Sequence, residues 1–267
     1  MSCLKKIAVF ALALSAVTLC AAERLSSGGA AGKTVRILYL GDSLADFDRG
    51  SNHVDRLQAL FDAKDTGKVK ISNFAIRGDY IERMMDRMNG KKGTYALARY
   101  KGIWDDSYDW AVVSLGHNDT RARSDVDYAV PFMSEEQLRT GFRDLIALLK
   151  SKGVKRIILR SAASCNFEAT SKNAARRLAA IKAGKVKKRK NGKMPVATRF
   201  GAPRFLEAFN AVMAELAAAD PAVEYFDIYT AMKALPDKAS YFRRDGVHLS
   251  QKGHRYIADV EYAYLGK

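Results

Sequence analysis

The sequence is poor in cysteine, with only three among its 267 residues. Two of them, Cys3 and Cys20, lie in an N-terminal segment that we predict to be removed, which leaves Cys165 alone. A single cysteine cannot form an internal disulfide, so the remaining chain must be held together by its hydrophobic core. No base motif adjoins Cys165, and we interpret it as a packed thiol rather than a catalytic one.

Two other features are missing. After the N-terminus no apolar run is long enough to cross a membrane, so no membrane-spanning segment is expected there. The acidic cluster Asp42, Asp46 and Asp48 lacks the glycine and the closing glutamate of a calcium-binding loop. We therefore predict neither a metal site nor a cofactor.

The first 22 residues have the three-part pattern of a secretory signal peptide. Lys5 and Lys6 form a positive start, and the apolar run Ile7–Thr18 is too short to span a bilayer comfortably. The small residues Cys20 and Ala22 suit cleavage by signal peptidase. This pattern predicts a secreted or periplasmic protein. Two alternatives stay open: an uncleaved N-terminal anchor, and a lipoprotein modified at Cys20.

Beyond a Gly/Ala/Ser-rich segment at residues 23–33, which we interpret as a flexible lead-in, strand-like and helix-like segments alternate over one domain, residues 34–267. Such alternation predicts an α/β fold with a parallel sheet and helices on both faces, a three-layer α/β/α sandwich. The expected strands are Val35–Leu40, Val69–Phe74, Trp110–Leu115, Arg156–Leu159 and Val223–Phe226, and the expected helices lie near residues 52–63, 79–89, 134–151, 204–219 and 252–264.

The first expected strand runs almost unbroken into Gly41-Asp42-Ser43. Its apolar character is typical of a strand buried on both faces of a parallel sheet. Ser43 then lies at the edge of the sheet where open α/β folds keep their ligand sites. Taken alone, a serine there is more readily explained as a helix N-cap. It becomes a nucleophile only if a base reaches it, and the stretch Asp245-Gly246-Val247-His248 offers one.

Two more polar blocks accompany the second and third expected strands: Asn73-Phe74-Ala75-Ile76-Arg77-Gly78 and Gly116-His117-Asn118-Asp119. Together with the stretches around Ser43 and His248, and in this order, they resemble the SGNH (GDSL-type) hydrolase superfamily of esterases and acetylesterases. The resemblance covers roughly residues 35–260. It implies a five-stranded, mainly parallel sheet of flavodoxin-like strand order.

The residues of these blocks are also of the types that ester hydrolysis by a serine nucleophile requires. His248 is the expected base for Ser43, and Asp245 can hold its imidazole in the required tautomer. For the oxyanion, we expect donors in the backbone N–H of Ser43, the N–H of Gly78, which has no Cβ, and the side chain of Asn118. In the family the matching glycine and asparagine have these roles. His117 is a further candidate for lining the substrate pocket.

The positive charge of the chain is concentrated in one segment. The formal net charge is +16, yet residues 172–204 contain twelve Lys and Arg and no Asp or Glu. We interpret this segment as a basic insertion on the sheet edge that carries Ser43. Behind a signal peptide we expect no nucleic-acid partner. Its residues Lys187, Lys188, Arg189 and Lys190 are candidates for steering an anionic substrate, the alternative being a solvated flexible loop without a specific partner.

We therefore predict a serine esterase that works through an acyl-enzyme and removes O-acetyl groups from a carbohydrate. A lipid or thioester acyl hydrolase is the alternative among enzymes, although no long apolar loop indicates a groove for an acyl chain. A non-catalytic envelope- or glycan-binding module is the alternative outside enzymes. That module would predict loss of Ser43, Asn118 or His248, and all three are present.

Overall fold

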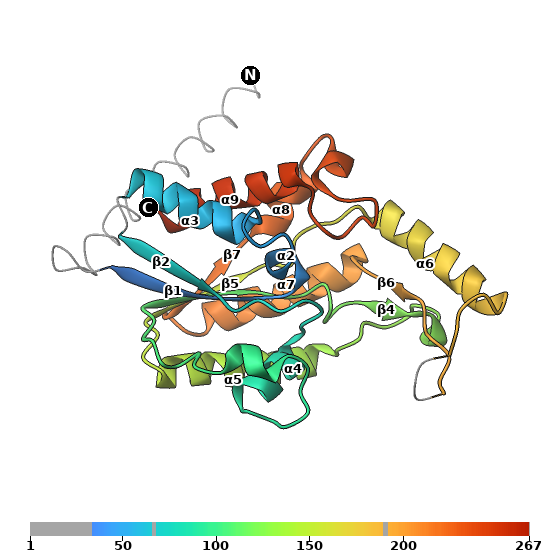
Figure 1. Cartoon of the computed structure of the whole chain (residues 1–267), viewed down its shortest axis with the longest axis horizontal. Coiled ribbons are helices and arrows are strands. Elements are labelled where there is room, and N and C mark those ends of the chain that lie inside the picture. Colours follow the sequence, from blue (N-terminus) through green and yellow to red (C-terminus); the bar gives the residue numbers. More distant parts are fainter. Residues whose placement is uncertain (1–33, 66–67, 189–191, 267) are drawn as a thin grey trace, which may run out of the picture.

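The computed structural model describes residues 34–65, 68–188 and 192–266. These residues form a central sheet with helices on both of its faces, a three-layer α/β/α sandwich (Figure 1). The predicted signal peptide and the lead-in at residues 23–33 lie outside the described residues. Within those residues, no helix combines the length and the apolar character needed to cross a bilayer.

The central sheet has five parallel strands in the order β2-β1-β3-β5-β7. This confirms the predicted α/β class and the flavodoxin-like strand order. Because all five strands run in one direction, their carboxyl ends meet at one edge of the sheet. The strands are β1 (Val35–Gly41), β2 (Val69–Asn73), β3 (Trp110–Ser114), β5 (Arg156–Arg160) and β7 (Val223–Phe226).

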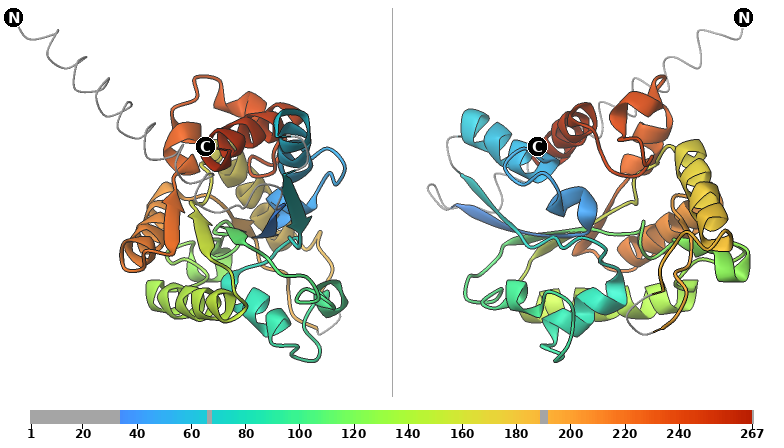
Figure 2. Two further views of the ribbon diagram at one scale, coloured as in Figure 1. Left: turned by 90° about the vertical axis from the view of Figure 1, so that its left-hand side faces the viewer. Right: turned by 45° about the vertical axis from the view of Figure 1, so that its right-hand side comes forward.

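Two groups of helices cover the sheet, one on each face (Figure 2). The first group is α3 (His53–Lys64), α8 (Ile228–Lys233) and α9 (Gln251–Leu265), and the second is α4 (Ile81–Met88), α5 (Glu135–Ser151) and α7 (Pro203–Ala218). The remaining elements are α2 (Ser43–Asp46), α6 (Phe167–Lys182), the 3-10 turns η1 (Leu97–Tyr100), η2 (Ser124–Val126) and η3 (Lys238–Tyr241), and a small antiparallel sheet of β4 (Ala122–Arg123) and β6 (Thr198–Arg199).

Strand β1 shows how the sequence pattern builds the two halves of the core. Successive side chains of a strand point to opposite faces of the sheet. Leu38 and Leu40 pack into the half of the core under α4, α5 and α7, whereas Ile37 and Tyr39 pack into the half under α3, α8 and α9. All four side chains are fully buried. A strand segment that is covered on both faces must be apolar at each position, and residues 37–40 show this pattern.

All five expected strands and all five expected helices are present, and α5 begins with the capping box of Ser134 and Gln137. The short helix α2 was not among the expected helices, and neither were α6 and α8. Helix α8 is only six residues long, and α6 buries just Thr170 and Ala174, so neither has a clear apolar stripe. Helix α6 occupies the first part of the basic insertion, which is therefore helical up to Lys182.

Candidate active site

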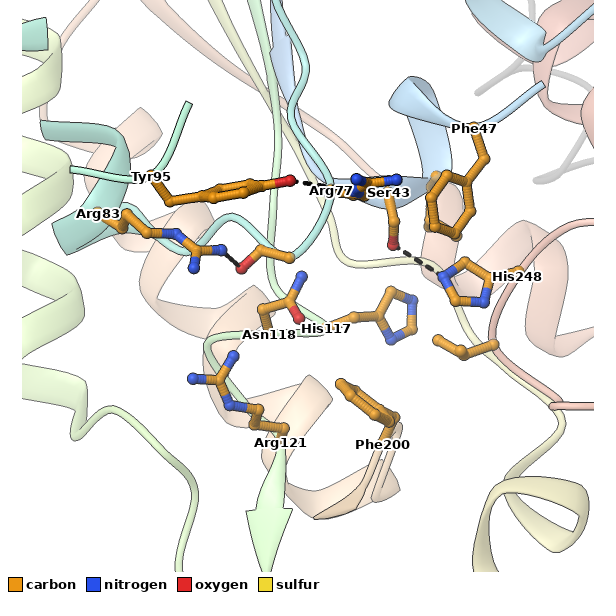
Figure 3. A pocket seen from close by; sticks show the side chains of 13 residues that line it. Ser43, Phe47, Arg77, Arg83, Tyr95, His117, Asn118, Arg121, Phe200 and His248 are labelled. Atoms are coloured by element: carbon orange, nitrogen blue, oxygen red, sulfur yellow. Dashed lines mark hydrogen bonds between the residues drawn. The ribbon is translucent and has the colours of Figure 1, made fainter. Parts of the chain in front are cut away.

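Ser43 lies immediately beyond the carboxyl end of β1, as the first residue of the short helix α2. The N-cap of this helix is Asp42, whose carboxylate accepts a hydrogen bond from the N–H of Leu44 at 2.9 Å. Because Asp42 caps the helix, the hydroxyl of Ser43 is free for another partner. It points into a pocket toward His248, with 2.9 Å between Ser43 Oγ and His248 Nε2 (Figure 3).

His248 and Asp245 lie on a tight loop between η3 and α9. One oxygen of Asp245 accepts from the N–H groups of Val247 and His248, and the other lies 2.7 Å from His248 Nδ1. The loop turns at Gly246, where φ is +80°. An added Cβ at Gly246 would lie 2.5 Å from the backbone oxygen of Asn166, so only glycine fits this turn without strain.

The ionisation of Asp245 determines the tautomer of His248. Burial acts to raise the pKa of Asp245, but hydrogen bonds from the side chain and N–H of His248 and from the N–H of Val247 outweigh it and lower the pKa to about 2. The carboxylate is therefore charged at neutral pH, and Nδ1 of His248 must carry the proton that is shared with it. Nε2 is then left with a free lone pair, which can accept the proton of the Ser43 hydroxyl.

Three hydrogen-bond donors gather beside the Ser43 hydroxyl. Within the described residues, the N–H groups of Ser43 and Gly78 donate to no protein atom. Gly78 follows β2 with φ of +76°, a conformation that suits glycine. Asn118, in the loop after β3, directs its amide group into the same pocket. Such an arrangement of donors suits an oxygen that becomes negatively charged during a reaction.

Two buried carboxylates position Asn118: Asp42 contacts its side chain, and Asp119 fixes its loop. The Nδ2 of Asn118 donates to Asp42 at 3.3 Å, so one of its two N–H bonds is fixed and the other is available. Asp119 accepts from the N–H groups of Ile81 and Gly116 at 2.8 and 3.0 Å, which ties the loop after β3 to helix α4. Burial raises the pKa of Asp42 to about 6 and that of Asp119 to about 7.

His117 also lines this pocket, as the sequence indicated. The residue is only 3% exposed, and neither ring nitrogen has a hydrogen-bond partner among the described residues. Burial lowers the pKa of His117 to about 3, so the imidazole is neutral at ordinary pH. His117 therefore contributes an uncharged ring to the pocket wall between Asn118 and His248 (Figure 3).

The pocket has a volume of about 480 Å³ and contains side chains that the sequence analysis did not select. Phe47 packs against the His248 ring, with 4.8 Å between the ring centroids. The others are Leu44, Arg77, Arg83, Tyr95, Arg121, Phe200 and Val247. Arg77 and Arg121 lie within or just beyond the polar blocks, so their positions in the sequence could have indicated them. Phe200 and Tyr95 are brought in by loops and carry no such signal.

Among the described residues of the basic insertion, Phe200 lines the pocket, but none of the basic side chains does. Lys187 and Lys188 are exposed after α6 and do not line the pocket, and Arg189 and Lys190 lie outside the described residues. Helix α6 itself extends beyond the carboxyl ends of the strands, on the side of the pocket (Figure 1). Steering by these four residues stays a prediction.

The sequence also led to expectations about Cys165 and about the acidic cluster Asp42, Asp46 and Asp48. Cys165 is buried, and burial raises the pKa of its thiol to about 12, so it is uncharged and packed. Asp46 and Asp48 of the acidic cluster pair with arginines, Asp46 with Arg49 and Asp48 with Arg243. Among the described residues, no group of three or more His, Cys, Asp or Glu side chains is arranged to hold a metal ion.

Comparison with known proteins identifies the class to which this fold and site belong. The profile of the GDSL-like lipase/acylhydrolase family matches residues 39–256. The chain belongs to this family, and it is a carboxylic ester hydrolase. No curated protein sequence matches the chain significantly.

Several solved structures share the fold. A lipase/acylhydrolase from Enterococcus faecalis is 18% identical with a TM-score of 0.55, covering 87% of this chain and 95% of its own. A catalytic mutant of an acetylxylan esterase from Geobacillus stearothermophilus is 19% identical with a TM-score of 0.56, covering 88% and 96%. A psychrotrophic esterase from Pseudoalteromonas sp., inhibited by monoethylphosphonate, is 16% identical with a TM-score of 0.55, covering 87% and 99%.

Proposed function

We propose that this ester hydrolase removes O-acetyl groups from a carbohydrate, with Ser43 as nucleophile, His248 as general base and acid, and Asp245 as the group that orients His248. The observation that carries the proposal is the unbroken chain of hydrogen bonds from Asp245 through His248 to Ser43, at 2.7 and 2.9 Å. This arrangement meets the geometric requirement for proton transfer from a serine nucleophile.

The proposed reaction has two halves. Ser43 Oγ attacks the carbonyl carbon of the ester while its proton moves to His248 Nε2, and the carbonyl oxygen becomes an oxyanion. The N–H groups of Ser43 and Gly78 and the amide of Asn118 stabilise this oxyanion. The carbon–oxygen bond to the sugar then breaks, and His248 returns the proton to the departing alcohol. A water molecule releases acetate from the acetyl-enzyme by the same steps, with His248 as base.

Two observations support a small acyl group on a polar alcohol. The pocket wall contains the polar side chains of Arg77, Arg83, Tyr95 and Arg121, which can form hydrogen bonds with a hydroxylated partner. A protein of the same fold is an acetylxylan esterase. With the signal-peptide pattern of residues 1–22, the proposal extends to an exported enzyme that acts on glycans outside the cytoplasm.

A fluorophosphonate probe tests the nucleophile. The wild-type protein should be labelled, and Ser43→Ala should lose labelling together with about 10⁴-fold or more of its esterase activity. Ser107→Ala, at an exposed serine in the loop before β3, serves as the matched control and should be labelled like the wild type. A folded wild-type protein that is not labelled would favour the non-catalytic binding module.

The acyl group is tested with 4-nitrophenyl acetate and octanoate. We expect the acetate to be hydrolysed with the higher kcat/KM, and free acetate to be released from acetylated glycans. A preference for the octanoate would instead indicate a lipid or thioester acyl hydrolase. Release from a panel of acetylated polysaccharides then identifies the sugar.

A further inference from the structure

The wall of the pocket is strongly cationic. Among the described residues that line it are three arginines, Arg77, Arg83 and Arg121, and no Asp or Glu. Two of these arginines are engaged by the protein. Arg83 binds the carboxylate of Asp79 and the carbonyl oxygen of Gly78, and Arg77 donates to the Tyr95 hydroxyl. Arg121 differs from both, because it makes no hydrogen bond or ion pair with any described residue.

Arg121 is nevertheless held in a defined place. Its guanidinium lies 3.8 Å from the ring centroid of Phe132 and 5.3 Å from that of Tyr80, and these two rings pack edge to face. Stacking on aromatic faces positions the guanidinium plane and leaves its N–H edges free to donate. Arg121 follows Asn118 by three residues, and the two side chains lie near each other, opposite His248 (Figure 3).

An arginine this enclosed normally has a counterion. Three other arginines with little exposed surface each face a carboxylate, in the pairs Arg87–Asp79, Arg156–Glu224 and Arg160–Glu261. The neighbour of Arg121 in sequence, Arg123, pairs with Asp125. Burial lowers the pKa of Arg121, and Arg83 acts in the same direction, whereas Tyr80 and the buried Asp119 oppose the shift. A guanidinium keeps its proton at physiological pH. Arg121 therefore presents to the pocket a positive charge that no carboxylate of the described residues contacts directly.

We infer that the ester substrate carries a carboxylate and that Arg121 binds it in the pocket beside the oxyanion donors. This inference rests on the proposed function, because it concerns the substrate of the same site. A guanidinium edge matches a carboxylate with two parallel hydrogen bonds, and the enclosed position of Arg121 strengthens such a pair. An acetylated sugar acid, with the carboxylate on its alcohol part, fits both the proposed deacetylation and this charge.

The test compares two esters that differ in one charge, 4-acetoxybenzoate and its methyl ester. The readout is selectivity, meaning kcat/KM for the anionic ester divided by kcat/KM for the neutral one. We expect Arg121→Gln to lower this selectivity about tenfold or more, the effect of losing a charge-assisted hydrogen bond. Arg121→Lys, which keeps the charge but not the planar fork, should give an intermediate value. Arg123→Gln is the matched control and should keep the selectivity within about twofold of wild type.

Mono-(4-nitrophenyl) succinate, compared with 4-nitrophenyl acetate, places the carboxylate on the acyl part instead. A selectivity that depends on Arg121 in either pair supports the inference and shows which part of the ester carries the anion. A selectivity unchanged by Arg121→Gln in both pairs overturns it. The neutral esters report the proposed function separately: if wild type hydrolyses none of the esters, both proposals fail, whereas hydrolysis without charge selectivity removes only this one.

Discussion

At the scale of single residues, the candidate site depends on a division of roles between neighbours. Asp42 caps helix α2 and also accepts from Asn118, so Ser43 is left free to face His248. From the sequence alone, Ser43 was the more obvious N-cap of a helix, but in the structure the N-cap is Asp42. Burying Asp42 and Asp119 behind the oxyanion donors costs free energy whenever they are ionised, and their raised pKa values express that cost.

Because burial penalises the ionised form of Asp119, we predict that the free energy of unfolding depends on pH through this residue. Burial raises its pKa from 3.8 to about 7, so between these values the folded state holds a proton that the unfolded state has lost. The contribution of Asp119 to stability is therefore present at low pH and is lost as pH rises through 7. Between pH 5 and pH 9 this loss is about 3 kcal/mol. Asp119→Asn removes it.

Urea denaturation of the wild type and of Asp119→Asn at both pH values measures the difference. The variant also loses an acceptor for the N–H of Gly116 or Ile81, so it should be less stable at pH 5. The gap between the two proteins should then narrow at pH 9. His117 and His254, whose pKa values are lowered by burial, act in the opposite sense but equally in both proteins. A gap that is constant with pH would contradict the prediction.

At the scale of elements, the site lies where three strands end and where helix α6 packs against the loop that carries His248. Ser43, Gly78 and Asn118 follow β1, β2 and β3, which are neighbours in the sheet. The loop that carries His248 lies between η3 and α9, far from these strands in the sequence. Helix α6 supports it, because the N–H of Asn166, the N-cap of that helix, donates to the carbonyl oxygen of Gly246 at 2.9 Å. The basic insertion thus begins within the helix whose N-terminal end supports the site.

Gly246→Ala tests this support. The new Cβ would lie 2.5 Å from the oxygen of Asn166 and 2.8 Å from the Cβ of Ala169, in a backbone conformation with φ of +80°. We expect a lower melting temperature and a fall in kcat of at least about tenfold, since small displacements of reacting groups are costly. Gly192→Ala is the control, because Gly192 has φ of +76° but nothing within 4 Å of an added Cβ. Equal effects of the two substitutions on the melting temperature and on kcat would show that backbone strain, and not the contact with α6, accounts for the effect of Gly246→Ala.

At the scale of the whole molecule, charge is distributed unevenly. Residues 172–204 contribute twelve Lys and Arg to the net charge of +16. Helix α6, which contains the first part of this segment, lies next to the edge of the sheet that holds the pocket. A cluster of charges of one sign near a binding site raises the rate at which oppositely charged partners arrive. Salt at ~0.1 M largely screens this attraction at distances beyond about 10 Å. This long-range attraction is separate from direct binding of a carboxylate by Arg121.

We predict that replacing Lys187, Lys188, Arg189 and Lys190 by Gln lowers kcat/KM several-fold for an acidic acetylated glycan at low salt. The effect should fade as salt is added, and a neutral acetyl ester should be hydrolysed as before. Four exposed lysines near the opposite edge of the sheet provide the control variant: Lys64, Lys68, Lys152 and Lys155. Loss of activity toward the acidic and the neutral substrate alike would mean that the segment does not steer the substrate.

The fold was accessible from the sequence because its signals are local. Each central strand is a short apolar run, and each run is bounded by residues that favour turns or helix starts. The capping box and the apolar stripe of helix α5 predict this helix from the sequence. Helix α6 has no such apolar stripe, because it lies at the edge of the molecule and buries few side chains. Local pattern predicts an element only when one of its faces enters the core.

The sequence by itself determined that Ser43, Gly78 and Asn118 would meet, because parallel strands bring their carboxyl ends to one edge whatever the loops between them do. Only the tertiary structure decided which charges in that pocket are compensated. Arg77, Arg83 and Arg121 look alike in the sequence, yet two have partners and the third is stacked on Phe132 without a counterion. The pairing of a charge depends on distances between residues far apart in the chain, and no local pattern contains those distances.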